Sequence, residues 1–314
     1  MNNAIMTTST TAITTNTSAI TADLMTKWVT FIDAKPRTIE TYTHNIKQFF
    51  VFMQANDITE PTREDIISYR DMLKATHKPA TVQAYITAIK LFFQWTEQEG
   101  IYPDIAKHVK GAKLDTDHKK DYMTAKQVSK ILASIDRTTL TGKRDYAMLC
   151  LMVTAGLRTI EITRADIDDI RARGDYTALY VQGKGHDEKN TFVKLAEPVE
   201  AAIREYLTAR GKTDSKEPLF ISHANRNNGE RMTTRSVRRI AKDILIAAGF
   251  NSDRLTAHSF RHTAATLNLL NGASLEETQQ LLRHTSINTT MIYSHALERA
   301  KNNSESRIAS AIFG

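Results

Sequence analysis

The sequence has little cysteine and lacks long apolar runs. Its 314 residues include one cysteine, Cys150, which excludes disulfides and cysteine-based metal sites and predicts a buried, inert thiol. The longest apolar run, Tyr146 to Val153, is far shorter than the roughly 18 residues of a membrane helix. No charge precedes Asp23, and this start lacks both the basic beginning and the apolar core of a secretory signal. We expect a disordered tail over 1–22 and a soluble, cytoplasmic protein that binds no membrane.

The net charge is slightly negative in the first third of the chain and positive in the rest. The length favours two domains. Residues 23–106 hold 9 basic and 11 acidic side chains, whereas residues 107–314 hold 33 and 24. The excess in the second part indicates either a polyanionic partner such as nucleic acid or the chance surplus of an ordinary enzyme.

Residues 23–106 have the pattern of a small helical bundle. Apolar residues recur every three or four positions over 39–53 and 82–93, and Pro61, Thr62 and Asp65 mark a helix start between these stretches. Aromatic residues at this spacing favour a core role over base stacking. Residues 107–120 lack periodicity and are rich in lysine, so they are predicted to be a linker.

Residues 121–300 are predicted to form a second, mainly α-helical domain with one β-hairpin. Helices are expected from Thr124, over 143–155, and after Ser274, and strands over 177–181 and 191–194. A helix around 237–245 carries cationic side chains outside its apolar face, at Arg235, Arg238, Arg239 and Lys242. These side chains could follow DNA phosphates or simply face solvent.

Four groups of polar residues occupy positions where they add nothing to the stability of a helix or hairpin. They are Arg158, Lys184 between two glycines, His258 with Arg261, and the stretch 284–293. Residues three apart project from one helix face, so His258 and Arg261 can converge on a small anion. A second arginine and a lysine would complete a cationic site for a phosphate, and a phosphate bound in this way needs a nucleophile.

In order and spacing, these clusters resemble the signature boxes of tyrosine recombinases of the phage-integrase and Xer branch. The boxes are AGLRTIE at 155–161, HSFRHT at 258–263, LLRH at 281–284 and TTMIYSH at 289–295. The resemblance covers about 124–295, and the preceding bundle is more loosely similar to that family's core-binding domain. It implies a mainly α protein with a SAM-like core-binding bundle and an α-rich catalytic domain that together form a C-shaped clamp on duplex DNA.

The resemblance implies DNA strand transfer through a covalent 3′-phosphotyrosyl intermediate. Tyr293 would attack the phosphate, the two arginines would neutralise its developing charge, and Lys184 would protonate the leaving 5′ oxygen. Joining would then need no nucleotide, and we expect no cofactor and no metal. The implied catalytic set is Arg158, Lys184, His258, Arg261, His284 and Tyr293, supported by Glu161 and His295.

The implied partners are duplex DNA and further copies of the chain in a tetramer on paired sites. The resemblance also allows for an accessory directionality protein or a partner recombinase. The protein would then be associated with the nucleoid. Residues 301–314 would dock on a neighbouring protomer. The preferred function is integration or excision of a mobile element, and the alternatives are Xer-type dimer resolution, type IB topoisomerase-like relaxation and a catalytically silent DNA-binding regulator.

Several residues have other interpretations or depart from the family pattern. Tyr293 could be a core tyrosine, and Lys184 a turn lysine with His186 and Lys189 as competitors. Arg283 stands where the family usually has glycine, at a helix end that could require positive φ, at a cost of about 1 kcal/mol. The net negative first domain would need a local DNA face, drawn from Lys35, Arg37, Lys78 and Lys90.

Overall fold

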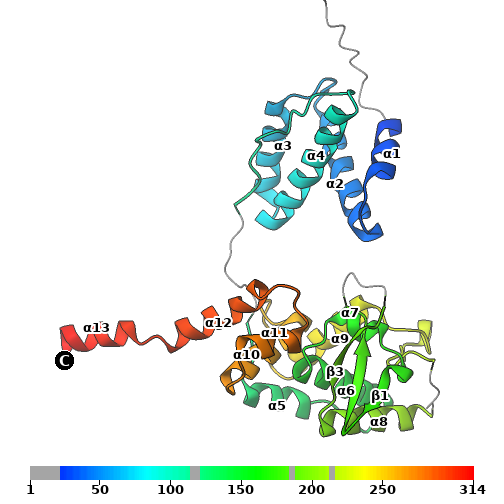
Figure 1. Cartoon of the computed structure of the whole chain (residues 1–314), viewed down its shortest axis with the longest axis vertical. Helices are drawn as coiled ribbons and strands as arrows, with labels where there is room; N and C mark the ends of the chain where they lie inside the picture. Colours follow the sequence, from blue (N-terminus) through cyan, green and yellow to red (C-terminus); the bar gives the residue numbers. More distant parts are fainter. Residues whose placement is uncertain (1–21, 114–120, 184–187, 212–215) are drawn as a thin grey trace, which may run out of the picture. The chain divides into compact units, whose positions relative to one another are not determined.

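The computed structural model describes residues 22–113, 121–183, 188–211 and 216–314 (Figure 1). They belong to two compact units, 1–117 and 118–314. The predicted fold class is confirmed, because both units are mainly helical and the strands form one small sheet. Of the tail predicted over 1–22, residues 1–21 lie outside the described residues, as does the linker segment 114–120, and residue 22 belongs to the first helix. None of the described helices is long and apolar enough to cross a membrane.

The described part of the first unit, 22–113, contains four helices around an aromatic core. They are α1 (Ala22–Phe31), α2 (Pro36–Ala55), α3 (Arg63–Thr76) and α4 (Pro79–Gln98). Phe49, Phe92 and Phe93 are fully buried and meet edge to face, so the predicted core role is confirmed. The predicted start of α3 is also correct, since the Thr62 N–H donates to Asp65 at 2.7 Å.

The second unit is built around one central helix. Its first elements are α5 (Ala125–Ala133), α6 (Leu140–Thr154), α7 (Thr159–Arg164), the 3₁₀ turn η1 (Ile167–Asp169), β1 (Ile170–Arg173), β2 (Tyr176–Val181), β3 (Thr191–Lys194) and α8 (Glu197–Arg210). Residues 147–153 of α6 are all buried, which suits a helix packed by α5, α8, α9 and α10. Burial raises the pKa of the Cys150 thiol to about 11, as expected for an unreactive cysteine.

The three strands form an antiparallel sheet with β2 in the centre. Leu179 of β2 pairs with Ile170 of β1 and with Val193 of β3. The predicted hairpin is confirmed, but β1 was not predicted. Its sequence, IRAR, is only four residues long and only Ile170 is partly buried, so the segment has little of the apolar signal that indicates a strand. Residues 184–187, between β2 and β3, lie outside the described residues.

The remaining helices carry most of the predicted site. They are η2 (Asn225–Asn227, a 3₁₀ turn), α9 (Thr234–Ala247), α10 (Ala257–Leu270), α11 (Leu275–Leu282), α12 (Asn288–Lys301) and α13 (Ser304–Phe313). Helices α10, α11 and α12 pack on one another around Ala265, Leu282 and Tyr293. Helix α13 follows α12 at the end of the chain (Figure 1), and in the described structure it buries none of its side chains.

Candidate active site

Arg261 lies at the centre of the candidate site, in the middle of α10. Its side chain is 2% exposed, and its guanidinium donates to the backbone carbonyls of Gly156 and Leu282. It therefore links the turn before α7 to the end of α11. Burial and the nearby charge of Arg158 lower its pKa to about 9, so the guanidinium is charged at neutral pH.

Arg158 is positioned by a buried carboxylate one turn further along the chain. The Arg158 N–H donates to Glu161 Oε2 at 2.7 Å, and its guanidinium Nη1 lies 2.9 Å from Glu161 Oε1. Glu161 is fully buried, whereas Arg158 keeps 28% of its side chain exposed. Burial alone would raise the pKa of Glu161, but Arg283 and the Arg158 N–H outweigh it and lower the pKa. The carboxylate stays charged and can orient Arg158, as the resemblance implies.

Tyr293 is held in α12 between two histidines. Its ring meets His262 edge to face, with centroids 4.8 Å apart, and lies nearly parallel to His284 at 6.4 Å. The phenol is 2% exposed. Burial raises the pKa of Tyr293, while the positive charges of Arg261 and Arg158 act in the opposite direction. Both arginines thus act electrostatically on the phenol.

His284 follows α11 and is fixed by hydrogen bonds. Its Nδ1 lies 2.8 Å from Thr290 Oγ1, and its backbone carbonyl accepts from Gln279 Nε2 at 3.0 Å. Burial, followed by the charges of Arg261 and Arg158, lowers the pKa of His284 to about 4. The imidazole is therefore neutral at pH 7.

The structure thus brings Arg158, Glu161, Arg261, His284 and Tyr293 together from four segments. His258 lies on the first turn of α10, is exposed, and also contributes to the low pKa of His284. Lys184 lies outside the described residues, as does the side chain of His295 in α12.

Two contributors to the site were missed or undervalued by the sequence reasoning. His262 was assigned no role from the sequence beyond its place in the HSFRHT box, but it is buried, bonds Thr266 at 3.1 Å and packs against Tyr293. Its position four residues after His258, on a helix that contacts the tyrosine helix, was the available signal. Thr290, which bonds His284, gave no comparable signal in the sequence.

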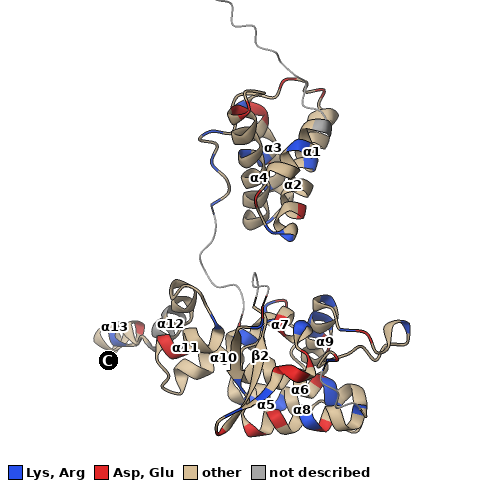
Figure 2. Cartoon of the chain, turned by 45° about the vertical axis from the view of Figure 1, so that its right-hand side comes forward, with Lys and Arg blue, Asp and Glu red and all other residues tan. Residues whose placement is uncertain are grey.

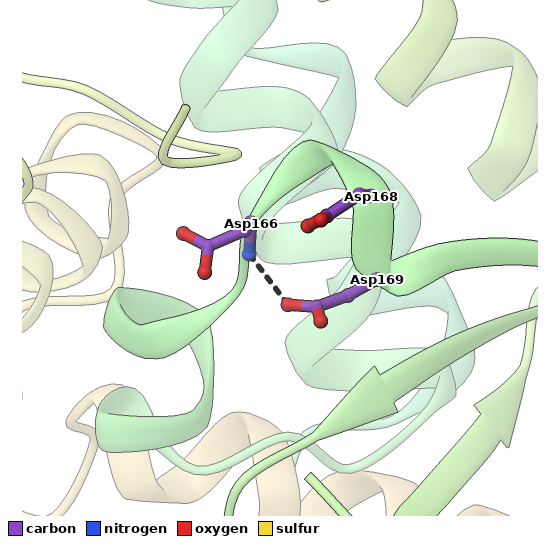
Figure 3. Close-up of side chains that lie close together, drawn as sticks. All are labelled: Asp166, Asp168 and Asp169. Carbon is purple, nitrogen blue, oxygen red and sulfur yellow. Dashed lines mark hydrogen bonds between the residues drawn. The ribbon is translucent and has the colours of Figure 1, made fainter. Parts of the chain in front are cut away.

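Lys189, one of the competitors of Lys184, is engaged in ion pairs. Its ammonium lies 2.6 Å from Asp166 and 2.5 Å from Asp169. Figure 3 shows these two side chains with Asp168 around η1, and the Asp166 N–H bonds Asp169. The oxygens of the three aspartates lie close enough to share an ion, but Lys189 and Arg231 already neutralise Asp166 and Asp169. We therefore assign the cluster an anchoring role at the base of the hairpin.

The predicted DNA-contacting side chains differ in their surroundings. On α9 the side chains of Arg235, Arg238 and Arg239 are exposed, and Figure 2 shows basic residues on this helix. The ammonium of Lys242 instead donates to the carbonyls of Ser252 and Leu255. In the first unit Lys35, Arg37 and Lys78 are exposed and Lys90 is half-buried.

Comparison with known proteins agrees with these features. The model of the phage integrase family matches residues 121–299, and that of the phage integrase N-terminal SAM-like domain matches residues 23–102. The chain therefore belongs to the phage integrase family.

Individual relatives define the class of enzyme more closely. Tyrosine recombinase XerD of Listeria innocua is 29% identical over 269 residues, covering 82% of this chain and 87% of the relative. Tyrosine recombinase XerC of Chlamydia trachomatis serovar L2 is 31% identical over 245 residues, covering 76% and 75%. The XerH site-specific recombinase, solved on palindromic difH substrate after cleavage, shares the fold with a TM-score of 0.69 at 21% identity, covering 87% of this chain and 78% of that one. The protein is a tyrosine-type site-specific DNA recombinase.

Proposed function

We propose that Tyr293 attacks a scissile DNA phosphate bound by Arg158 and Arg261. The observation that carries this proposal is the convergence of two arginines and two histidines on one buried tyrosine. In the reaction the phenolic oxygen bonds to phosphorus, the bond to the 5′ oxygen breaks, and that oxygen takes up a proton. The 3′-phosphotyrosyl bond retains the energy of the phosphodiester, so rejoining would need no nucleotide cofactor.

The electrostatics of the site suit this chemistry. A phenol with a raised pKa attacks only if its proton leaves as the bond forms, and nearby guanidinium groups favour the negative charge that then develops. The neutral imidazole of His284 can accept a proton or a hydrogen bond beside Tyr293. His258, one turn before Arg261, is proposed to contact the same phosphate.

Lys184 is proposed as the acid that protonates the 5′ oxygen, on the strength of the family resemblance. The segments on both sides of 184–187 support this placement. The Gly183 carbonyl accepts from Arg164 Nη1 at 3.2 Å, and Lys189 binds the aspartates after α7. The β2–β3 hairpin is thus attached to the segment that follows Arg158.

Duplex DNA is the proposed substrate. Lambda integrase was solved on a COC′ core site and as a tetramer on a Holliday junction, and these structures share the fold of this chain with TM-scores of 0.66 at 18% and 17% identity. The exposed Arg235, Arg238 and Arg239 are the proposed phosphate contacts on α9. The proposed DNA-contacting residues of the first unit are Lys35, Arg37, Lys78 and Lys90.

The proposed assembly is a tetramer on two DNA sites, joined in part by residues 301–314. Ile308, Ile312 and Phe313 of α13 are 59%, 65% and 85% exposed. A helix this short is marginal alone, and its apolar residues would gain most from burial on a second protomer. The C-shaped clamp and any accessory protein are likewise proposals from the resemblance.

Two biological settings fit this chemistry. The similarity to XerD and XerC favours Xer-type resolution of chromosome or plasmid dimers. Integration or excision of a mobile element is the other, and a Tn1549 transposon integrase solved on transposon right-end DNA shares the fold with a TM-score of 0.67 at 16% identity. Recovered DNA sites distinguish the settings, because a mobile element is flanked by two sites and a dimer carries repeated copies of one.

Recovery of denaturant-resistant protein–DNA adducts from expressing cells tests the proposal. We expect sequenced adducts at a few sharp sites with the natural chain and none with Tyr293→Phe. The matched control is Tyr206→Phe, which removes another buried tyrosine hydroxyl near a histidine, on α8. It should retain the adducts.

Adducts that persist in Tyr293→Phe would refute the assignment of the nucleophile. Adducts scattered over the genome would instead indicate topoisomerase-like relaxation. Binding to DNA without adducts in any of the proteins would favour a catalytically silent regulator.

A further inference from the structure

Arg283 has a backbone conformation that arginine rarely adopts. It follows α11 with φ 53° and ψ 47°, in the left-handed region. Among the described residues, the other non-glycine residues with positive φ are Asp57 and His108, and aspartate and histidine are enriched in that region. An arginine gains no such tolerance, and glycine would avoid a cost of about 1 kcal/mol. The side chain must therefore form stabilising contacts that glycine cannot form.

The guanidinium of Arg283 binds four acceptors on two segments. Nη1 donates to the carbonyls of Leu281 at 2.7 Å and Ala155 at 3.3 Å. Nη2 donates to the Gly156 carbonyl at 3.3 Å and to Glu161 Oε2 at 2.9 Å. The side chain is 9% exposed, so these bonds compensate a charge that is largely removed from water.

Two of these acceptors are shared with the two arginines of the proposed phosphate site. Glu161 binds Arg158 through Oε1 and Arg283 through Oε2. The Gly156 carbonyl accepts from Arg261 and from Arg283. A planar fork can bridge such acceptors, whereas the point charge of lysine cannot reproduce that geometry.

We propose that Arg283 is a positioning residue of this centre, whose guanidinium sets the relative placement of Arg158 and Arg261 by binding the acceptors that each of them uses. The proposal rests on the function proposed above. Arg283 does not act on the phosphate itself, because its terminal nitrogens are occupied by the carbonyls and by Glu161.

Arg283 also adds to the positive charge around His284. Among the described residues, the charged and titratable groups that face His284 are Arg261 and His258 from α10, Arg158 before α7, the neighbouring Arg283, and Tyr293 from α12. Loss of Arg283 would remove one positive charge and let the pKa of His284 rise toward its ordinary value, whereas a lysine there would retain most of the effect.

Two substitutions separate the effect of the planar guanidinium group of Arg283 from the effect of its positive charge. Arg283→Gly suits the left-handed backbone and removes both, while Arg283→Lys keeps the charge and the backbone cost. We expect adduct recovery to fall at least tenfold in both variants, with unchanged binding to a 40-base-pair random duplex. The pKa of His284, followed by NMR of the imidazole, should rise in Arg283→Gly only. The control is Arg204→Ala on α8, which breaks an exposed ion pair with Glu200 and should change neither quantity.

Wild-type adduct recovery in Arg283→Gly or in Arg283→Lys would overturn the proposal. An equal loss of duplex binding in both variants would also do so, because it would indicate a general defect. If Arg283→Gly failed to fold, adduct recovery in Arg283→Lys alone would show whether the guanidinium geometry is required. If the natural chain itself gave no adducts, the proposed function would fail separately, and an unchanged His284 pKa in Arg283→Gly would then refute the placement of Arg283 in this site.

Discussion

The buried carboxylate of Glu161 offers the sharpest test of how the site is held together. It is fully buried and accepts from two guanidinium groups and from the Arg158 N–H. Removing one partner of a buried ion pair costs about 3–5 kcal/mol. Glu161→Gln keeps one acceptor oxygen but places an NH₂ group against a guanidinium. We expect the free energy of unfolding to fall by about 3 kcal/mol, at the lower end of that range.

A matched glutamate provides the control. Glu205 also binds two cations, Arg137 and Lys143, but 32% of its side chain is exposed. Solvent screens such pairs, so Glu205→Gln should cost less than about 1 kcal/mol. Urea titrations of the natural chain and of both variants, followed by circular dichroism, measure the difference. Equal losses in the two variants, or a loss below about 1 kcal/mol for Glu161→Gln, would refute the reasoning.

The ion pairs of Glu161 also predict how the free energy of unfolding depends on pH. The pKa of Glu161 is lowered in the folded protein, so its charge contributes stability that is present above the ordinary value of 4.5. This contribution is lost as the pH falls toward the lowered value. The difference in free energy of unfolding between the natural chain and Glu161→Gln should therefore be largest at pH 7 and should decrease below pH 4.5. A gap that widened on acidification would contradict the assigned direction.

Three further outcomes are expected. Gly156→Ala should lower stability by about 2–4 kcal/mol in the same urea assay, because φ is +58° and a Cβ would lie 2.8 Å from Leu282 Cδ2; a neutral variant would show that this turn adapts. Deleting Ser304–Gly314 should preserve binding to duplex DNA in gel shifts but reduce assembly on paired sites, and normal recombination by the truncated chain would argue against docking. Cys150, with its pKa near 11, should react with a thiol reagent only on unfolding, and rapid reaction of the native protein would contradict its burial.

Features that depend on short sequence patterns were predictable. The capping pairs at Thr62, Thr124 and Ser274 act within three residues, and each is present in the structure. The left-handed end of α11 was expected from the family's usual glycine, and it is confirmed at Arg283. Strand β1 was missed because it has four residues, three of them exposed, and so carries little apolar signal.

Features that depend on packing between distant segments were not predictable. The sequence showed an arginine at 283 but not where its guanidinium points, because three of its four acceptors, on Ala155, Gly156 and Glu161, lie more than 120 residues away. The contact of His262 with Tyr293 likewise arises from the packing of α10 on α12. Sequence reasoning identified the chemical groups of the site, whereas the network that orients them required the structure.

The charge balance of the site explains why folding alone would not favour this arrangement. In its described part, the guanidinium groups of Arg158, Arg261 and Arg283 share the single carboxylate of Glu161. Arg261 is buried against backbone carbonyls, which satisfy its hydrogen bonds but carry no net charge, so Glu161 offsets its charge only in part. A bound phosphodiester would supply the missing negative charge, and the charge would grow as Tyr293 attacks. The excess positive charge is thus a cost in the free protein that becomes favourable when the substrate binds and reacts.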